Sequence, residues 1–571
     1  MVSSVNLPIV EFDYKPPVVP RGNPEAKILW VGEAPGKNEM EAGVPFVGAA
    51  GHELDNMAAE AGISMAACRL TNVIGYRPTN NAISNFFATS KKQAAEMGTV
   101  TYCGKYAMPV IYAGIKELEQ EIKRVKPNVV IACGNVALWA CTGEWGILKW
   151  RGSEMEGQIN DTKFKVIPII HPAGILRNWA WRWHTVVDLR RAARESAVRH
   201  VRVPKYRFCV RPSFHSVVDI LCGLYIVLEH HPVKLAVDIE TRLRHIACIG
   251  LAWSELDALC IPLLCIEDDH GYWSKSEEKT IWWYLYKVLT HPNCEVVGQN
   301  FMYDNQYFAR RAGFTCNLVD DTMMKMHVVF PGVSKDLAFI SSIFCKFHRF
   351  WKEEGKEWVK TMDEDQLWVY NCKDAVATYE ADQTLDQLLT DFNLRAQYNE
   401  RMEVAEEAFK MMLRGVEVST QFKRQLQKDC RAAIKQRKDF LQEILGFNLF
   451  GPQGGVSPKK MKMLCYDLFG LPPKYRIDQA TKQRRLTCNK DAIDDWLQTC
   501  DIFYRPILKI IKDVRSLTVF KSMFADAKLD WDERFRCSFK VAGPHTFRWA
   551  SAEDAFGFGG NLQNIPKGDE R

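Results

Sequence analysis

Hydrophobic runs and polar stretches alternate along much of this 571-residue chain in the manner of an α/β protein. Between residues 26 and 200, the strand-like runs AKILWVG, NVVIACG and FKVIPIIHP are separated by stretches with helical periodicity. The alternation returns in 232–330, with two strands, a helix near 276–290 and the strand CEVVGQN. Helical periodicity dominates from about 336 to 445 and continues to the end, interrupted by a basic, proline-rich stretch at 470–486. A chain of this length predicts about three or four domains.

Composition narrows the class of protein. The chain is 47% hydrophobic and 25% charged, which is ordinary for a soluble globular protein, and its net charge of +6 is mild. Its 18 cysteines are scattered without a CxxC pair, which favours free thiols in a reducing compartment over a disulfide framework or a zinc ribbon. The N-terminus lacks an apolar signal-peptide core, and no run approaches 18 apolar residues. We therefore expect a cytoplasmic protein without a membrane span.

The stretch 177–211 is locally basic. It carries ten Lys and Arg residues against Asp188 and Glu195, and Trp179, Trp181 and Trp183 lie among them. Cationic groups interleaved with aromatic rings suit contact with phosphates and bases. A solvated helix face followed by a linker explains the same pattern equally well, so both interpretations stay open.

Acidic residues mark the first candidate for chemistry. Asp238 and Glu240 follow an apolar strand at i, i+2 spacing, which places both carboxylates on one face of a strand. Either the pair is solvated at a strand end, or a cation belongs between them. Asp304 follows the strand VVGQN, and Asp374 lies in a helical stretch on the same face as Tyr370. Four convergent carboxylates with two divalent ions would form a site that hydrolyses phosphodiesters.

These acids resemble the motifs of the DEDD 3′–5′ exonucleases, in particular the tyrosine-bearing proofreading domain of family A DNA polymerases. The motifs occur in the family's order, and KDLAFISSIF at 335–344 stands where that family has an apolar helix. The resemblance implies that two Mg²⁺ or Mn²⁺ ions are held by the carboxylates of Asp238, Glu240, Asp304 and Asp374. It also implies that Tyr370 orients the attacking water and that Asn300 contacts the substrate.

The C-terminal part resembles the thumb and early palm of the same polymerases. The resembling segments are 403–419, 448–472 and 507–523, the last with Lys509, Lys512, Arg515 and Lys521 available for phosphates. The stretch 538–566 matches the family signature at Thr546, Arg548, Ser551 and 561–566. The resemblance implies that Arg548 contacts the primer terminus in the minor groove. Phe547 departs from the pattern, because the family has glycine there.

The catalytic palm and fingers residues of that family do not occur before Arg571. Transfer of a nucleotide needs metal ions held by those palm carboxylates. We therefore expect that this polypeptide does not polymerise alone. It is interpreted either as a gene fragment or as one half of a split polymerase that a second chain completes.

The N-terminal part carries a third set of motifs, which includes VGEAPGKNE at 31–39, GVPFVGAAG at 43–51, TNV at 71–73, GNVAL at 134–138 and IHP at 170–172. Together they resemble the family 4 uracil-DNA glycosylases over roughly residues 26–195. The resemblance implies that Phe46 stacks on a flipped base, Asn72 reads uracil and His171 donates to uracil O2. It also implies that Glu33 positions the attacking water and that Glu39 excludes thymine. Leu176 and Arg177 lie in the loop that in the family enters the duplex.

The family's iron–sulfur ligands are largely missing. No cysteine precedes Cys68, Gly75-Tyr76-Arg77-Pro78 replaces the family's Cys-Arg-Pro-Pro, and Cys103 alone could correspond to a ligand. We therefore expect no iron–sulfur cluster. The base-reading residues favour a working pocket, and the alternative is a domain that binds uracil or DNA without cleaving it.

The sequence thus predicts a multidomain α/β enzyme of DNA replication and repair. Residues 1–200 form a uracil-DNA glycosylase-like α/β sandwich, 201–230 a linker, 231–390 an RNase H-like exonuclease fold, and 396–571 a mainly helical thumb with a truncated palm. The expected partners are single-stranded 3′ ends, uracil-containing DNA, primer-template and a second polymerase chain, with no membrane. One alternative is a DNA-binding, uracil-sensing subunit in which the exonuclease alone is catalytic, and another is a purely structural half of a split polymerase. The unusual fusion suggests a bacteriophage origin.

Overall fold

The computed structural model describes residues 17–265, 271–354, 363–477 and 484–565. The chain divides into two compact units. The first contains residues 1–304 and 312–398, and the second contains residues 305–311 and 399–571. Within the described ranges, no helix is long and apolar enough to span a bilayer. The first 16 residues, residues 478–483 of the basic stretch and Pro566 lie outside the described residues.

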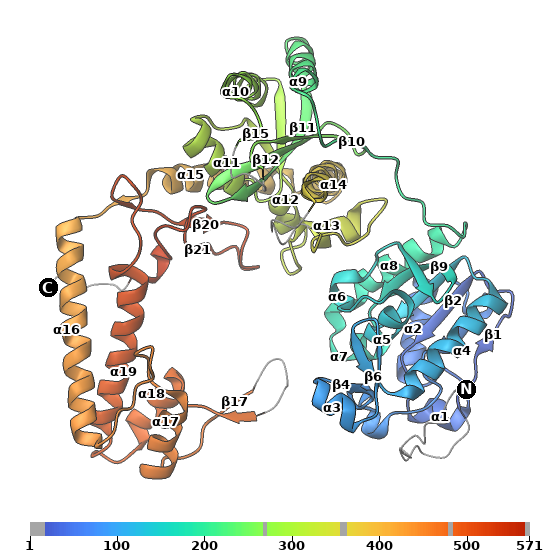
Figure 1. The fold of residues 1–571 in the computed structure, drawn as a ribbon, viewed down its shortest axis with the longest axis horizontal. Helices are drawn as coiled ribbons and strands as arrows, with labels where there is room; N and C mark the ends of the chain where they lie inside the picture. Colours follow the sequence, from blue (N-terminus) through green and yellow to red (C-terminus); the bar gives the residue numbers. More distant parts are fainter. Residues whose placement is uncertain (1–16, 266–270, 355–362, 478–483, 566–571) are drawn as a thin grey trace. The chain divides into compact units, whose positions relative to one another are not determined.

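The N-terminal part of the first unit is built on a six-stranded sheet (Figure 1). Its order is β1 (Arg21–Gly22), β3 (Arg69–Asn72), β2 (Ile28–Gly32), β7 (Val129–Cys133), β9 (Thr162–Ile169) and β8 (Met155–Ile159). The four central strands are parallel, and the two edge strands are antiparallel to their neighbours. Helices that accompany it include α2 (Ala49–Glu60), α4 (Pro109–Val125), α5 (Asn135–Thr142), α7 (Pro172–Arg177) and α8 (Arg182–Glu195). The three strands predicted from apolar runs are β2, β7 and β9.

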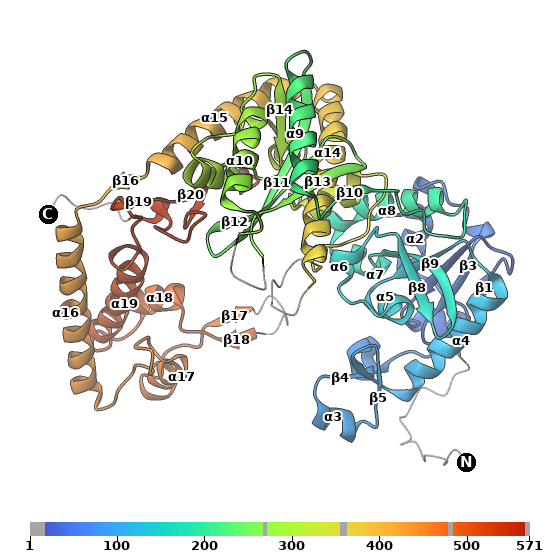
Figure 2. The same ribbon diagram turned by 45° about the horizontal axis from the view of Figure 1, so that its top comes forward.

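A second six-stranded sheet lies in the same unit (Figure 2). Its order is β10 (Arg207–Cys209), β13 (Asp257–Pro262), β12 (His245–Ala252), β11 (Val233–Arg242), β14 (Cys294–Gly298) and β15 (Leu318–Asp321). An antiparallel meander of β11, β12 and β13 continues into parallel β14 and β15, as the predicted RNase H-like fold requires. The helices are α9 (Phe214–Leu228), α10 (Lys275–Leu289), α11 (Met302–Tyr307), α12 (Thr322–Val329), α13 (Leu337–Phe344) and α14 (Glu364–Asp391).

Two features of this sheet differ from the pattern read in the sequence. The predicted linker contains β10, which pairs with β13, and α9, which packs beside α10. Residues 207–228 therefore belong to the exonuclease-like sheet and its helical cover. In addition, β11 continues through Asp238 and Glu240 to Arg242, so the two acids lie within a strand and not beyond its end. A register shift between Glu240 and Thr241 marks where the pairing becomes irregular.

Most of the basic stretch is used in ion pairs inside the first unit. The pairs are Arg182 with Glu53 and Glu60, Arg191 with Glu154, Arg194 with Glu154 and Glu195, Arg202 with Glu195, Arg207 with Asp257, and Arg211 with Asp365. Trp183 stacks on Phe330. Trp179 is the exception, because 59% of it is exposed and the Arg182 guanidinium lies over its ring. The structural interpretation of this stretch therefore accounts for most of its charges.

A buried lysine supports the second sheet. Lys325 on α12 has no exposed side-chain surface, and its ammonium lies 2.9, 2.6 and 2.8 Å from carboxylate oxygens of Asp320, Asp382 and Asp386. Removal of one partner from a buried ion pair leaves an uncompensated charge.

We expect Lys325→Met to lower the free energy of unfolding by about 3–5 kcal/mol, because the buried carboxylates of Asp320 and Asp382 and the partly exposed one of Asp386 would lose their shared cation. Urea unfolding followed by circular dichroism measures this difference. Lys279→Met on the exposed face of α10 is the control and should change stability little. Equal stability of the two variants would contradict the assigned role of Lys325.

The second unit is mostly helical. It contains most of α15 (Arg395–Arg414), then α16 (Thr420–Leu445), α17 (Pro458–Lys462), α18 (Lys490–Thr499) and α19 (Arg505–Phe520). α16 and α19 run side by side, and their core includes Leu441, Met461, Trp496, Leu508 and Ile511. Short pairs of strands complete the unit, namely β16 (Val416–Glu417) with β19 (Arg534–Phe535), β17 (Tyr475–Ile477) with β18 (Arg484–Leu486) and β20 (Ser538–Lys540) with β21 (Ala550–Ala552).

Candidate active sites

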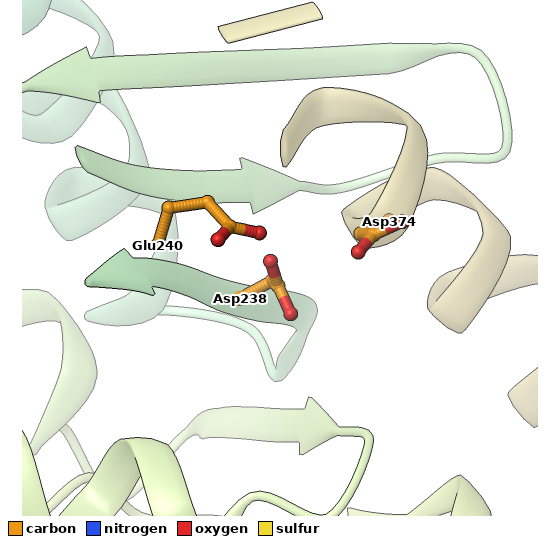
Figure 3. A group of neighbouring side chains, drawn as sticks. All are labelled: Asp238, Glu240 and Asp374. Carbon is orange, nitrogen blue, oxygen red and sulfur yellow. The ribbon is translucent and has the colours of Figure 1, made fainter. Parts of the chain in front are cut away.

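Three predicted carboxylates converge between β11, an interior strand of the second sheet, and helix α14. Asp238 and Glu240 project from one face of β11 toward Asp374 on α14, as Figure 3 shows. One oxygen of each lies within 4.8 Å of the others. Asn371, one turn before Asp374 on α14, donates from Nδ2 to Asp238 Oδ2 at 2.7 Å. Strand and helix are thus fixed to each other beside the cluster.

Asp304 lies next to this group but faces a backbone amide. Its Oδ1 accepts the N–H of Ile239 at 3.1 Å, between the two acids of β11. Burial and the neighbouring Asp238 raise the pKa of Asp304 well above its ordinary value. Asn300 follows β14 with a left-handed φ of 57° and is exposed, and its backbone N–H binds Asp321. The structure therefore brings Asp304 to the cluster and leaves Asn300 at its surface.

Tyr370 lies one helical turn before Asp374 and shares a lysine with it. The ammonium of Lys352 donates to Asp374 Oδ2 and lies 3.2 Å from the Tyr370 hydroxyl. The indole N–H of Trp351 donates to Asp374 Oδ1 at 2.6 Å. Neither residue was predicted from sequence, because both lie outside the recognised motifs, in a segment without regular secondary structure.

Burial and neighbouring carboxylates raise pKa values within the cluster, so nearby positive charge would stabilise the ionised forms. Burial and Asp374 raise the pKa of Asp238 to about 7, and burial and Asp238 raise the pKa of Glu240 well above its ordinary value. Lys352 opposes both shifts. In this setting the ionised acids need further cations nearby. Within the described ranges, this is the one group of three or more acidic, histidine or cysteine side chains with that convergence, and its oxygen donors fit hard divalent cations.

The second candidate site lies at the carboxyl edge of the first sheet. Glu33 follows β2, Asn72 ends β3, Gly134 follows β7 and His171 comes two residues after β9. Because these strands are parallel neighbours, their carboxyl ends meet at one edge, where ligands of open α/β sheets bind. The motifs that are separate in the sequence are thus collected in one place.

Asn72 and Phe46 meet over a glycine. A Cβ at Gly32 would lie 2.1 Å from Asn72 Oδ1 and 2.9 Å from Phe46 Cζ, so only glycine leaves room for both side chains. The Nδ2 atom of Asn72 is buried and has no hydrogen-bond partner. A buried amide without a partner costs free energy unless a ligand satisfies it. Asn72 therefore has a free donor for a ligand at this edge.

His171 is set to donate from Nε2. Its Nδ1 accepts the N–H of Ala173 at 3.2 Å and caps α7, so in the neutral ring the proton lies on Nε2. Burial lowers the pKa of His171, although Glu33 opposes the shift, and the neutral form is favoured. Glu33 Oε1 accepts the N–H of Val136 at 3.1 Å, and a Cβ at Gly134 would come within 2.5 Å of the same oxygen.

Glu39 is engaged with the backbone around Phe46. One of its oxygens accepts the N–H of Phe46 and the other accepts the N–H of Gly36. Phe46 itself adopts a left-handed φ of 57°, an uncommon conformation for a bulky residue, and is 6% exposed. The carboxylate of Glu39 therefore fixes the ring position, and its predicted exclusion of thymine stays a prediction.

We expect Glu39→Gln to lower the rate of uracil excision by about tenfold to a hundredfold, because one amide oxygen cannot accept both N–H groups and the Phe46 ring shifts. Single-turnover cleavage of a uracil oligonucleotide measures this loss. Glu41→Gln on the same helix is the control, since its carboxylate is exposed and pairs only with Lys37. A Glu39→Gln rate equal to that of Glu41→Gln would contradict the role in positioning.

A pocket of about 740 Å³ opens beside Glu33 and His171. Trp145, Lys149, Arg177 and Trp181 are among its lining residues. Leu176 on α7 is 47% exposed, so the predicted duplex-entering loop presents an apolar side chain to solvent.

All 18 cysteines of the chain are free thiols. Cys103 is exposed, and its segment supplies no set of four thiolates such as an iron–sulfur cluster uses. The residues present therefore do not fit such a cluster, and its absence from the working protein stays a prediction.

The polymerase-like signature of the second unit also has a defined geometry. Ser551 on β21 donates to Asn561 Oδ1 at 2.7 Å, which joins two parts of the motif. Arg548 is exposed, and Phe547 before it adopts φ 59°. The backbone at Phe547 thus takes the left-handed conformation that glycine favours, although phenylalanine occupies the position.

Comparison with known proteins identifies the families of the two domains that contain these sites. Residues 19–196 match the family described as the uracil DNA glycosylase superfamily, and residues 224–390 match that described as 3′-5′ exonuclease. The chain belongs to the uracil DNA glycosylase superfamily through its N-terminal part, which is fused to a 3′–5′ exonuclease domain. The two domains mark it as a hydrolytic enzyme that acts on DNA.

Two relatives are type-4 uracil-DNA glycosylases. The Archaeoglobus fulgidus protein is 32% identical over 160 residues, which are 27% of this chain and 69% of that protein. The Thermotoga maritima protein is 33% identical over 163 residues, which are 28% of this chain and 72% of that protein. Among solved structures, the POL domain of Pol1 from M. smegmatis in complex with DNA primer-template and dNTP aligns with a TM-score of 0.46 and 18% identity. That alignment covers 64% of this chain and 56% of the other, which is less than two thirds of its length.

Proposed function

We propose that this chain removes uracil from DNA and degrades DNA from its 3′ ends in a metal-dependent reaction. The convergence of Asp238, Glu240 and Asp374 from strand and helix carries the proposal, since three carboxylates within 4.8 Å can be ionised together only where cations compensate their charge. Asp304 would complete the set of ligands for two Mg²⁺ or Mn²⁺ ions. When bound, such ions would supply a water of lowered pKa and stabilise the charge on the attacked phosphate.

The protein's own groups have distinct tasks in the exonuclease. The carboxylates of β11 and α14 are the ligands, and the Tyr370 hydroxyl orients the attacking water from the next turn of α14. Asn300, at the exposed end of β14, contacts the terminal nucleotides. An editing role for a growing strand is the biological setting that this activity suits.

Uracil excision would use the side chains that meet at the carboxyl edge of the first sheet. The flipped uracil stacks on Phe46, the Asn72 amide accepts from N3–H and donates to O4, and the neutral His171 donates from Nε2 to O2. That donor stabilises negative charge on the leaving base. Glu33 holds the attacking water and stabilises the positively charged sugar. The unpartnered Nδ2 of Asn72 supports this arrangement most directly.

We assign residues 396–571 to the thumb and early palm of a family A polymerase on sequence resemblance. In this role α16 and α19 grip duplex DNA through exposed basic side chains, and Arg548 contacts the primer terminus. A second chain that supplies the remaining palm and fingers is part of the proposal. Purification of the chain from its native cell, followed by mass spectrometry of whatever copurifies, tests for that chain.

A uracil-containing oligonucleotide tests the two activities separately. Abasic sites that form in EDTA report excision, and shortening from the 3′ end that needs Mg²⁺ reports the exonuclease. Tight binding of uracil DNA without abasic sites would support the sensing module in place of a glycosylase.

A further inference from the structure

The metal-ligand candidate Asp374 is oriented by two residues that do not belong to its helix. Trp351 donates to one carboxylate oxygen at 2.6 Å, and Lys352 donates to the other. Trp351 is 6% exposed and packs with Leu337 and Ala377. Both oxygens of Asp374 thus take their positions from the segment 345–353, which we call the bridging segment.

The other side of the bridging segment is fastened to the glycosylase domain. The Phe350 ring belongs to that domain's hydrophobic core and lies 5.3 Å from the Trp150 ring. The Phe350 N–H donates to Ser153 Oγ at 3.1 Å, and the His348 carbonyl accepts the Glu154 N–H at 2.7 Å. Phe350 and Trp351 are consecutive, so the packing of the Phe350 ring in the glycosylase core restricts where the Trp351 ring lies beside Asp374.

A buried arginine of α8 holds the start of the bridging segment. Arg191 donates to the carbonyls of Ser342 and Cys345 at 2.9 and 3.0 Å and to that of Lys346 at 3.0 Å. These carbonyls lie at the C-terminal end of α13, where a helix leaves carbonyls without intrahelical partners. The Arg191 side chain is 4% exposed and pairs with Glu154, so the guanidinium that binds these carbonyls is buried and its charge is balanced.

We propose that Trp351 and Lys352 are positioning residues of the exonuclease, and that the glycosylase domain holds them in place through Arg191 and the seat of Phe350. The inference rests on the proposed exonuclease function of Asp374. It makes the exonuclease dependent on the glycosylase fold. Uracil excision, in contrast, does not depend on the exonuclease carboxylates.

The test uses the full chain and the variants Trp351→Phe, Lys352→Met and Arg191→Met. Mn²⁺ affinity is measured by electron paramagnetic resonance, 3′ exonuclease rates are measured against Mn²⁺ concentration, and uracil excision is measured in EDTA. Groups that hydrogen-bond a metal-ligating carboxylate contribute about tenfold to a hundredfold to metal affinity or activity. We expect losses of about that size in Mn²⁺ affinity and exonuclease rate for all three variants, with uracil excision unchanged. Lys352→Arg should recover part of the loss.

Matched controls are available for each variant. Trp283→Phe removes a half-exposed indole N–H on α10, Lys163→Met removes an exposed ammonium that pairs with Glu156, and Arg124→Met removes an exposed guanidinium that pairs with Glu121. If Arg191→Met also loses uracil excision, its fold is affected. Ser153→Ala, which removes only one hydroxyl beside Phe350, then tests the same connection and should lower Mn²⁺ affinity by a smaller factor.

The proposal is overturned if Trp351→Phe and Arg191→Met both bind Mn²⁺ as tightly as the unmodified chain. If Arg191→Met is misfolded, the same result for Trp351→Phe and Ser153→Ala overturns it. Failure of the proposed function gives a different result. In that case the unmodified chain binds Mn²⁺ in a manner that Asp238→Ala abolishes but degrades no DNA, and the affinities of the variants still decide the positioning role. Absence of Mn²⁺ binding in the unmodified chain would overturn both.

Discussion

Asp238→Ala is expected to abolish metal-dependent degradation of DNA from the 3′ end, with a loss of about a thousandfold or more, since several kcal/mol of charge stabilisation depend on its carboxylate. Asp238 lies between Glu240 and Asp374, and Asn371 fixes its orientation through a hydrogen bond of 2.7 Å. Its removal leaves the remaining acids without the geometry to hold two ions. Quenched time courses with a 5′-labelled oligonucleotide in Mg²⁺ measure the loss.

The same preparation supplies the control for folding. Uracil excision by Asp238→Ala should equal that of the unmodified chain, because the glycosylase residues do not contact this cluster. Asp257→Ala, at a carboxylate of the same sheet that pairs with Arg207, should leave the exonuclease intact. An Asp238→Ala protein that digests 3′ ends at the normal rate would remove the basis for the exonuclease assignment.

Asn72→Ala is expected to lower uracil excision by about a hundredfold, because the buried amide that pairs with the base is lost. His171→Ala should act in the same direction, since the Nε2 donor would no longer stabilise the leaving base. Formation of abasic sites, read as alkali-labile breaks under single-turnover conditions, measures both effects. Asn23→Ala, at an exposed turn, is the control.

Two outcomes separate excision from recognition. If the unmodified chain forms abasic sites and Asn72→Ala does not, the first sheet carries a glycosylase. Should the unmodified chain bind uracil DNA tightly and leave it intact, with that binding lost in Asn72→Ala, the domain is the uracil-sensing module considered from the sequence.

The sequence predicted the parts of the sites that short motifs carry. The i, i+2 spacing of Asp238 and Glu240 predicts that both side chains lie on one face of a strand, whether or not the strand continues past them. The i, i+4 spacing of Tyr370 and Asp374 predicts that they share one face of a helix. Glu33, Asn72 and His171 follow strands of a parallel sheet, so their meeting at one edge follows from topology. Local geometry sufficed for the acid pair and for Tyr370 with Asp374, whereas Glu33, Asn72 and His171 were assigned through the family resemblance.

The sequence did not predict contacts that depend on docking between distant segments. Trp351 and Lys352 contact Asp374 from a segment whose preceding residue, Phe350, lies in the core of the glycosylase domain. Arg191 was counted as one charge in a basic run, whereas its guanidinium binds carbonyls more than 150 residues away. Periodicity and composition contain no signal for such pairings, because they report which face is apolar and not which partner covers it.

The linker shows a related effect. VRVPKYRFCVRPSF has the prolines and scattered charges of a connector, yet its central residues form β10, which pairs with β13 of the exonuclease sheet. Phe547 shows that a sequence can depart from a family's glycine and still form the left-handed turn. Tertiary context overrode local preference at both places.

We propose that one chain carries two separate hydrolytic centres for DNA, one that cleaves the N-glycosidic bond of uracil and one that cleaves 3′-terminal phosphodiesters, and that only the second needs metal. A single 5′-labelled oligonucleotide with one internal uracil, incubated with the full chain in EDTA and in Mg²⁺, distinguishes the two centres. We expect an alkali-labile site at the uracil in both buffers and a ladder of 3′-shortened products only in Mg²⁺. Intact DNA in both buffers, or a 3′ ladder that persists in EDTA, would contradict this proposal.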